Sequence, residues 1–226
     1  LSWEKNNTWN VGLDASFLDN KINFQVDVYD RLSHGMLLSK QVPATSGFTS
    51  TLMNIGSLKN TGVEAQIDAN ILKVGDFNWD FGVNFAHNKT KILDLGDVDE
   101  MTYSGDSRLK HVVGKSFFTF YLKDYYGVNP SNGEALWRTE DGTLTNDYNK
   151  AQYVYAGSPE PKFTGGFNTS ISWKGLTLSA FFEYKYGNKV LIIENRYVNS
   201  DGNQMTMNQT TSSLNYWQKP GDTGCN

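Results

Sequence analysis

Cysteine, proline and histidine are scarce in this chain of 226 residues, which holds one cysteine, five prolines and three histidines. The one thiol, Cys225, excludes an internal disulfide framework and a zinc site built from cysteines. His34, His87 and His111 lie far apart in the sequence and lack the spacing of metal ligands. We therefore expect no metal site and no cofactor.

Long hydrophobic runs and an excess of positive charge are also missing. No segment approaches the ~18 apolar residues that a membrane helix needs, and hydrophobic residues make up only 38% of the chain. The net charge of −4 argues against a nucleic-acid partner. Because neither a signal peptide nor an initiator methionine begins the chain at Leu1, we interpret it as a piece of a longer mature protein.

Aromatic residues are plentiful, at 14% of the chain, and many belong to segments in which apolar and polar side chains alternate. The clearest alternation flanks Lys174-Gly175, a pair that suits the two-residue turn of a tight β-hairpin. Each arm has the ~9–11 residues with which a tilted strand crosses a bilayer. The apolar positions of this hairpin are Phe163, Phe167, Thr169, Ile171, Trp173, Leu176, Leu178, Ala180, Phe182, Tyr184 and Tyr186.

Two further hairpins show the same alternation earlier in the chain. Their turns are predicted at Asp19-Asn20 and at Gly75-Asp76, and each turn brings apolar positions of its two arms onto one face. The arms comprise residues 9–17 and 22–28 in the first hairpin, and residues 63–71 and 79–85 in the second.

The segments between the hairpins are long and irregular in pattern. Residues 31–61 and 93–161 are rich in glycine and polar residues, so we predict long loops there rather than strands. Residues 188–226 are predicted to form a polar tail. Since structureless loops of this length are uncommon in compact domains, we expect the second loop to be functional.

The two faces of the hairpins differ in charge. A charge that faces lipid costs roughly 2–4 kcal/mol at mid-bilayer, whereas a water-filled lumen tolerates it. Short turns that alternate with long loops are also typical of an outer-membrane barrel. The sequence therefore predicts an all-β fold, a segment of an antiparallel transmembrane β-barrel with long extracellular loops, and a soluble β-sandwich is the alternative. The apolar faces carry no charge, and the opposite faces carry Asp14, Asp27, Glu64, Asp68, Asp80, Glu183 and Lys185.

Several segments resemble one known family. The run from Asn54 to Glu64, NIGSLKNTGVE, is similar to the NIGS-x-x-NxGVE signature of SusC-like TonB-dependent transporters. Further similar segments follow the order of that family along essentially the whole chain. They are Trp3-Glu4, residues 10–14 (NVGLD), residues 132–137 (NGEALW), residues 157–168 (GSPEPKFTGGFN), and Tyr184 with residues 187–189 (GNK).

The resemblance implies a barrel of about 22 strands whose lumen holds an N-terminal plug. Six strands are read here, so we expect residues 1–226 to be a late, partial section of the barrel domain, without the plug domain or the final strands. It also implies a place in the bacterial outer membrane, in contact with its lipid. The implied partners are TonB, through the missing plug region, and a SusD-like surface lipoprotein.

The resemblance implies TonB-dependent import of an oligosaccharide, or of a peptide, and not an enzyme. Acidic residues on strands that face a lumen are ordinarily solvated or hydrogen-bonded, so we do not expect a carboxylate pair for glycoside hydrolysis. A passive porin-type channel and a soluble β-rich binding module are the alternative functions.

Aromatic residues of the second long loop are the candidate ligand- or partner-binding residues. Tyr126, Trp137 and Tyr155 are the best candidates, because rigid aromatic side chains give a large contact area at a low entropic cost. Packing within the loop itself is the alternative role for these side chains.

Overall fold

The computed structural model describes residues 1–200 and 203–224, so Cys225 lies outside the described residues. The chain forms two compact units. The first comprises Leu1–Thr119 and Gly157–Lys189, and we call it the sheet unit. The second, which we call the loop unit, comprises Phe120–Ala156 and the residues from Val190 onward. Among the described residues, no helix is long and apolar enough to cross a membrane.

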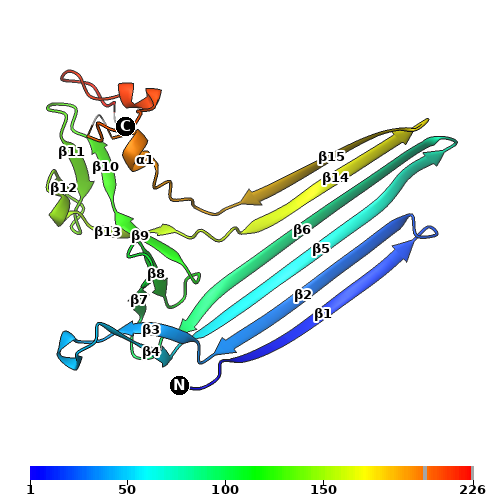
Figure 1. The fold of residues 1–226 in the computed structure, drawn as a ribbon, viewed down its shortest axis with the longest axis horizontal. Coiled ribbons are helices and arrows are strands. Elements are labelled where there is room, and N and C mark those ends of the chain that lie inside the picture. Colours follow the sequence, from blue (N-terminus) through cyan, green and yellow to red (C-terminus); the bar gives the residue numbers. More distant parts are fainter. Residues whose placement is uncertain (201–202, 225–226) are drawn as a thin grey trace. The chain divides into compact units, whose positions relative to one another are not determined.

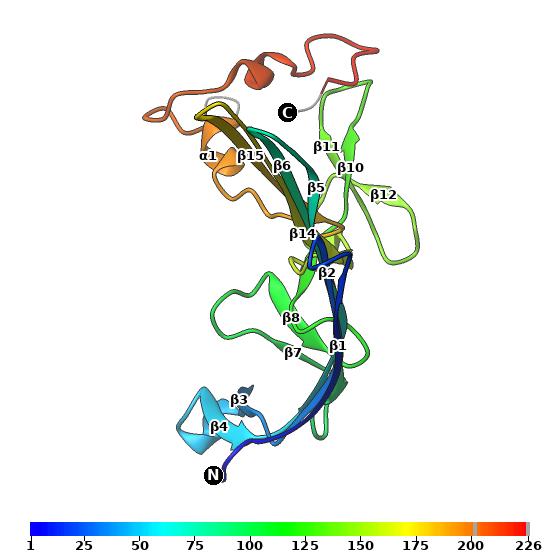
Figure 2. The ribbon, with the colours of Figure 1, turned by 90° about the vertical axis from the view of Figure 1, so that its right-hand side faces the viewer.

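The sheet unit is built on six long strands that lie side by side (Figure 1). Neighbours in the sheet are antiparallel and follow the chain order β1-β2-β5-β6-β14-β15. Figure 2 shows the same sheet nearly edge-on, as a curved and twisted layer. The antiparallel all-β fold and its six strands are thus confirmed. The strands are β1 (Lys5–Phe17), β2 (Ile22–His34), β5 (Ser57–Val74), β6 (Phe77–Asp94), β14 (Phe163–Trp173) and β15 (Leu176–Tyr186).

The three predicted hairpin turns lie together at one end of this sheet (Figure 1). Asp19 and Asn20 have φ values of 55° and 63°, and Lys174 and Gly175 have values of 47° and 85°. Positive φ at both central residues gives the turn that matches the right-handed twist of the flanking strands. Because the turns are short here, the long connections leave from the opposite end of the sheet.

The register puts the predicted apolar positions of neighbouring strands on one face. Phe167 lies opposite Phe182, with the two rings stacked at a centroid distance of 4.6 Å, and Trp173 lies opposite Leu176. Phe182 remains 53% exposed, as a side chain does that no protein layer covers. The strands therefore present one continuous apolar face and one polar face.

A one-residue bulge in β5 keeps this apolar face in phase. The pairing with β6 runs regularly up to Asn70 opposite Asp80, then resumes with Leu72 opposite Trp79, so Ile71 has no cross-strand partner. The apolar pattern of β5 changes phase at this point, from odd-numbered to even-numbered positions. The bulge absorbs the extra residue, and Leu72 then lies on the same face as Trp79.

The prediction that residues 31–61 form a loop was wrong at both ends. β2 continues to His34 and β5 begins at Ser57, because backbone pairing between the two strands extends beyond the apolar alternation. Between them, β3 (Leu37–Gln41) and β4 (Ser50–Asn54) form a hairpin that holds the 3-10 turn η1 (Ala44–Ser46).

A small hydrophobic core forms where this hairpin packs against the outer ends of the long strands. Met36, Leu38, Ile92 and Leu95 are its buried members, and Ile92 and Leu95 are fully buried. The short strands β7 (Glu100–Thr102) and β8 (Leu109–Val112) pair nearby in the same unit. This core belongs to the connecting segments and is separate from the broad apolar face.

The segment from Asn54 to Glu64 owes its residue types to close packing at this end. Asn54 Nδ2 donates hydrogen bonds to the carbonyl oxygens of Ser2 (2.8 Å) and Gly35 (2.9 Å). Gly56 has a φ of 96°, and a Cβ there would lie 3.1 Å from the carbonyl oxygen of Asp94. Only glycine takes that conformation without strain, so Asn54 and Gly56 have structural roles.

The prediction of an irregular segment over residues 93–161 was also wrong, because short strands run through it. In the loop unit, β10, β11 and β12 form a three-stranded antiparallel sheet, and β13 lies beside β9. These strands are β9 (Thr119–Lys123), β10 (Tyr125–Val128), β11 (Ala135–Arg138), β12 (Leu144–Thr145) and β13 (Tyr153–Gly157), and the 3-10 turn η2 spans Tyr148–Lys150.

The polar tail contributes to the loop unit. It contains the short helix α1 (Asn195–Val198) and the 3-10 turn η3 (Thr211–Leu214). Trp217 Nε1 donates a hydrogen bond to the carbonyl oxygen of Pro130 at 3.1 Å. Its ring lies against Gly133, where a Cβ would come within 2.7 Å of the indole. The tail is thereby fixed to the β10–β11 connection.

Candidate functional site

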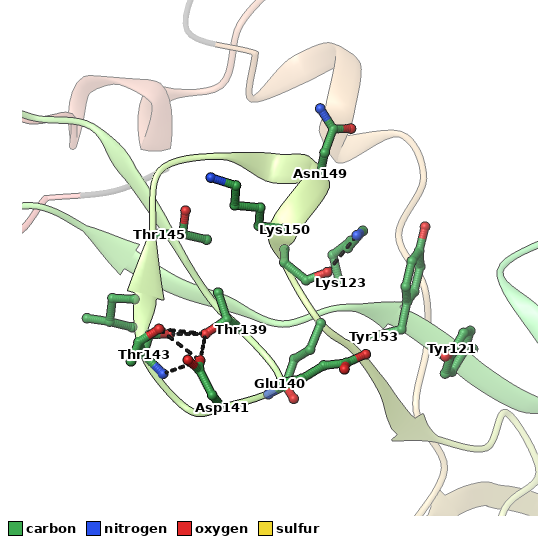
Figure 3. Close-up of a pocket in the computed structure, with 13 residues that line it drawn as sticks. Tyr121, Lys123, Thr139, Glu140, Asp141, Thr143, Thr145, Asn149, Lys150 and Tyr153 are labelled. Atoms are coloured by element: carbon green, nitrogen blue, oxygen red, sulfur yellow. Dashed lines mark hydrogen bonds between the residues drawn. The ribbon is translucent and has the colours of Figure 1, made fainter.

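A groove of about 750 Å³ opens in the loop unit (Figure 3). Its volume lies within the ~300–1,000 Å³ range of small-ligand sites. Hydroxyl, amide, ammonium and carboxylate groups line it together with two tyrosine rings. The lining residues are Tyr121, Lys123, Thr139, Glu140, Asp141, Thr143, Leu144, Thr145, Asn149, Lys150, Ala151, Gln152 and Tyr153.

Two neighbouring strands supply the aromatic side of the groove. Tyr121 on β9 and Tyr153 on β13 stack with a centroid distance of 4.8 Å and an interplanar angle of 14°. The alternation of side chains puts Tyr155, two residues along β13, on the same face, where its ring lies 5.2 Å from that of Tyr121. The rings of Tyr121, Tyr153 and Tyr155 therefore form one aromatic surface.

Lys123 fixes the position of this aromatic side. Its Nζ donates a hydrogen bond to the carbonyl oxygen of Ala151 at 2.6 Å and lies 4.3 Å from the centroid of the Tyr153 ring. A cation over a ring face is attracted by the ring quadrupole. The same contact leaves a positive charge at the edge of the groove (Figure 3).

A tight turn between β11 and β12 forms the opposite side. Asp141 accepts hydrogen bonds from the Thr143 hydroxyl (2.9 Å), the Thr143 amide (3.2 Å) and the Thr139 hydroxyl. The Thr139 hydroxyl and then the Thr143 hydroxyl lower the pKa of the Asp141 carboxyl, because they stabilise its charged form. Asp141 is therefore an anion that orders the turn, rather than a proton donor.

The arrangement suits binding better than acid–base catalysis. Glu140, Asn149 and Gln152 add further acceptors and donors along the groove. Gln152 is held by its hydrogen bond to Asp124 Oδ2 at 3.0 Å. Stacked rings beside fixed polar groups match ligands that have both flat apolar faces and many hydroxyl or amide groups.

The structure separates the three predicted site residues. Tyr155 belongs to the aromatic side of the groove and is 43% exposed, although it does not line the cavity itself. Tyr126 is 54% exposed and lies beside the Arg138 guanidinium, 5.0 Å from ring centroid to Cζ. Both remain predictions as binding residues.

Trp137 packs within the loop unit. Its ring makes edge-on contacts with Tyr125 at 5.9 Å and with Tyr148 at 5.5 Å. Trp137 belongs to β11 and is not among the residues that line the groove. This geometry favours the structural role that the sequence left open for it.

Sequence reasoning overlooked Tyr121, Lys123 and the turn at residues 139–143. The turn has a recognisable pattern, because Asp-Gly between two threonines is a typical turn sequence. Tyr121 and Tyr153 lie far apart along the chain, and no periodicity in the sequence pairs β9 with β13. Their stacking follows from the topology alone.

Histidines and acids are dispersed in the part of the chain that the structure describes, and no group of three or more could hold a metal ion there. His87 Nδ1 lies 2.6 Å from the carbonyl oxygen of Lys162, and His111 Nδ1 lies 2.7 Å from that of Phe117. Both rings thus lie within hydrogen-bonding distance of backbone carbonyl groups.

Comparison with known proteins agrees with this fold. Residues 1–181 match the family model described as TonB dependent receptor-like, beta-barrel. The TonB-dependent receptor SusC of Bacteroides thetaiotaomicron is 30% identical over 229 residues, which cover 95% of this chain and 22% of that protein. The TonB-dependent receptor P26 of Formosa agariphila is 32% identical over 224 residues, which cover 88% of this chain and 22% of that protein.

A solved structure gives the same result in three dimensions. A chain of the RagAB peptide transporter superposes with a TM-score of 0.85 and 30% sequence identity, covering 98% of this chain and 25% of that chain. This chain thus spans about a quarter of the length of the relatives it matches. The match decides against a soluble β-sandwich, and the chain belongs to the TonB-dependent receptor β-barrel family.

Proposed function

We propose that the full-length protein carrying this chain is an outer-membrane importer that takes up an oligosaccharide in a TonB-dependent step. The observation that carries the proposal is the pairing of an apolar sheet face, whose predicted lipid-facing positions carry no charge, with a polar face across six strands of transmembrane length. In a barrel, the first face contacts lipid and the second lines the path of the substrate.

The loop unit supplies the recognition surface in this proposal. β6 ends and β14 begins at the end of the sheet opposite the short turns. Outer-membrane barrels place their long loops outside the cell. The groove therefore belongs to an extracellular connection. Its tyrosine faces suit the apolar faces of sugar rings, and its threonine, asparagine and carboxylate groups suit sugar hydroxyls.

A peptide is the second candidate substrate. The matched solved structure is a peptide transporter, and the groove also offers amide and charged partners for a peptide backbone. The turn at residues 139–143 favours the oligosaccharide, since its hydroxyl and carboxylate oxygens are held in place by one another and can accept further hydrogen bonds from sugar hydroxyl groups.

Two partners complete the proposal. A SusD-like lipoprotein would associate with the extracellular loops, as the likeness to SusC and to RagAB suggests, and TonB would act through a plug region outside this chain. Tyr126 is the exposed aromatic that we assign to the contact with the lipoprotein, and Tyr155 is assigned to the ligand.

Binding to the full-length protein tests the assignment of the groove. Tyr153→Ala removes the ring that both stacks on Tyr121 and supports Lys123, so we expect oligosaccharide affinity to fall about tenfold. Tyr216→Ala is the matched control, because Tyr216 is 50% exposed in the same unit and does not line the groove. Titration calorimetry with neutral oligosaccharides and with short peptides measures both.

The outcomes separate the alternatives. Loss of affinity for peptides alone would assign the groove to peptides and contradict the oligosaccharide proposal. Shortening residues 131–156 in the full-length protein should leave barrel assembly intact and weaken lipoprotein association or uptake. Normal uptake and a normal complex after that deletion would remove the loop unit from the transport function.

A further inference from the structure

The apolar face of the sheet carries basic residues at the end of the strands farther from the short turns. Register places cross-strand rows on this face, and one of them runs Val11, Val28, Val63 and His87 across β1, β2, β5 and β6. The next row, farther from the short turns, contains Trp9, Asp30, Thr61 and Lys89. The apolar character therefore ends between these two adjacent rows.

The row beyond brings lysines together. Lys59 on β5 lies directly opposite Lys91 on β6, and Lys89 lies two residues from Lys91 on the same face. Directly opposed side chains have Cβ atoms about 4.5–5.5 Å apart, where like charges are destabilising. Three lysines therefore occupy neighbouring positions on one face of the sheet, and we call Lys59, Lys89 and Lys91 the lysine trio.

One acid offsets part of this charge. Asp30 Oδ2 lies 2.7 Å from Lys59 Nζ. Within residues 1–200 and 203–224, no carboxylate forms an ion pair with Lys89 or Lys91, and both side chains are exposed. The lysine trio therefore has excess positive charge where the apolar face ends, and an anion from outside the chain would neutralise it.

We propose that the lysine trio binds the phosphate groups of a phosphorylated glycolipid in the outer leaflet around the barrel. This inference rests on the outer-membrane placement in the proposed function. The acyl chains would lie against the apolar rows, and the headgroup phosphates would then reach the height of the row beyond Trp9. Basic clusters next to a membrane surface bind anionic lipid by charge complementarity.

A lipid fits this edge better than an acidic protein. The trio lies on the same face as the apolar residues and directly continues it, so a ligand at the trio is also a ligand of the apolar face. The aromatic pair Phe163 and Tyr186, stacked at 6.4 Å, lies near the same edge on β14 and β15, as aromatic girdles do at a membrane interface.

The test uses the purified full-length protein, stripped of lipid in detergent. The probes are a diphosphorylated lipid A and its dephosphorylated form with the same acyl chains, with retention measured by native mass spectrometry. We expect the triple variant K59Q/K89Q/K91Q to bind the phosphorylated probe about tenfold or more weakly. The charge-conserving variant K59R/K89R/K91R should bind it normally.

Lysines at the other end of the sheet give a control of matched charge. The variant K21Q/K73Q/K174Q removes three exposed lysines at or near the short turns, and we expect it to bind the probe as the wild type does. Heat-resistant migration on gels shows that each variant is folded. If the glutamine triple variant does not fold, K89Q and K91Q alone each replace it in the same measurement.

Three results would overturn the proposal. The first is equal retention of both probes by the wild type. The second is retention of the phosphorylated probe by the triple variant at the wild-type level. The third is loss of the lipoprotein partner, with lipid binding intact, in the triple variant, which would assign the trio to a protein. Substrate uptake is measured separately, so failure of lipid binding with normal uptake overturns this inference and leaves the proposed function standing.

Discussion

The sheet unit and the loop unit surround their large apolar and aromatic side chains in different ways. In the sheet unit, Leu178 is 72% exposed and Tyr186 is 68% exposed, and such side chains form a continuous outer face. In the loop unit, aromatic rings contact one another and nearby cations, as in the stack of Tyr121 and Tyr153 beside Lys123. The first arrangement needs an apolar solvent, and the second organises a surface in water.

This difference shows where each unit obtains its stability. The ladder of backbone hydrogen bonds satisfies the polar groups of the sheet unit, and lipid would cover its apolar face in the proposed outer-membrane placement. The loop unit relies on stacked rings, turn hydrogen bonds and the attachment of Trp217 to Pro130. In that placement, the sheet unit depends on the membrane and the loop unit depends on local packing.

Placing this chain alone in water should have the largest effect. Only seven hydrophobic residues are buried among the described residues, too few to hold a chain of this size together in water. The outer edges of β1 and β15 also carry unpaired backbone groups. We expect the isolated chain to aggregate in detergent-free buffer, as measured by size-exclusion chromatography and thermal unfolding. A soluble monomer with cooperative melting would contradict the claim that the sheet unit needs an apolar solvent.

A charge on either face of β15 should separate lipid from lumen. Phe182→Arg puts a cation against acyl chains and loses the stack on Phe167, so we expect a loss of roughly 2–4 kcal/mol in the unfolding free energy of the full-length protein. Ser179→Arg is the control, because Ser179 bonds Ser170 on the polar face at 3.0 Å and should cost little.

Urea unfolding in lipid vesicles, followed by heat-modified gel mobility, measures both variants. Equal destabilisation by the two substitutions would mean that the two faces meet the same solvent. That result would break the distinction on which the membrane role of the sheet unit depends.

The strands with period-two alternation were predictable, and the pairing of Phe167 with Phe182 is an example. What the pattern missed is the outer third of the sheet, where β5 begins at Ser57 and β6 ends at Asp94. Backbone pairing continues there after apolar alternation stops, because the backbone ladder does not require apolar side chains. The bulge at Ile71 was not predicted either, because Ile71 and Leu72 are both apolar and the alternation alone does not show which of them lies outside the pairing.

A smaller effect is expected from a substitution at Gly62 in β5, where the packing leaves no room for a side chain. A Cβ at Gly62 would lie 2.4 Å from Cζ of Tyr29 and 2.9 Å from the carbonyl oxygen of His87. Tyr29 covers this glycine and donates a hydrogen bond to Asn88 Oδ1 at 3.2 Å. Gly62→Val should therefore destabilise the full-length protein by about 1–3 kcal/mol, by the same urea assay.

A double-mutant cycle isolates the cause. Tyr29→Ala in the Gly62→Val background should recover part of the loss, because the clash disappears with the ring. Additive losses in the double variant would show that the His87 carbonyl, and not the tyrosine, sets the requirement for glycine.

The groove was only partly predictable. Aromatic content pointed to the right segment, and Tyr155 lies at the groove's aromatic side. The pairing of Tyr121 with Tyr153, however, depends on β9 lying beside β13, a contact between distant residues that leaves no local pattern. Trp137 was selected as a rigid aromatic residue, and its contacts with Tyr125 and Tyr148, which the sequence does not reveal, favour a packing role, so its binding role stays a prediction.

The smallest expected effect concerns the turn at residues 139–143 and its pH dependence. Two threonine hydroxyls hold the pKa of Asp141 below its ordinary value of 3.8. A carboxyl whose folded pKa is lowered contributes stability above its unfolded pKa, and that contribution is lost as the pH falls through the lowered value. The turn should therefore keep its order from neutral pH down to about pH 4 and loosen below it.

Asp141→Asn should loosen the turn at every pH. Hydrogen exchange of the Thr143 amide, taken as the ratio of the variant to the wild type in the full-length protein, measures this. A constant ratio below pH 4 would show that the backbone, rather than the carboxylate, orders the turn.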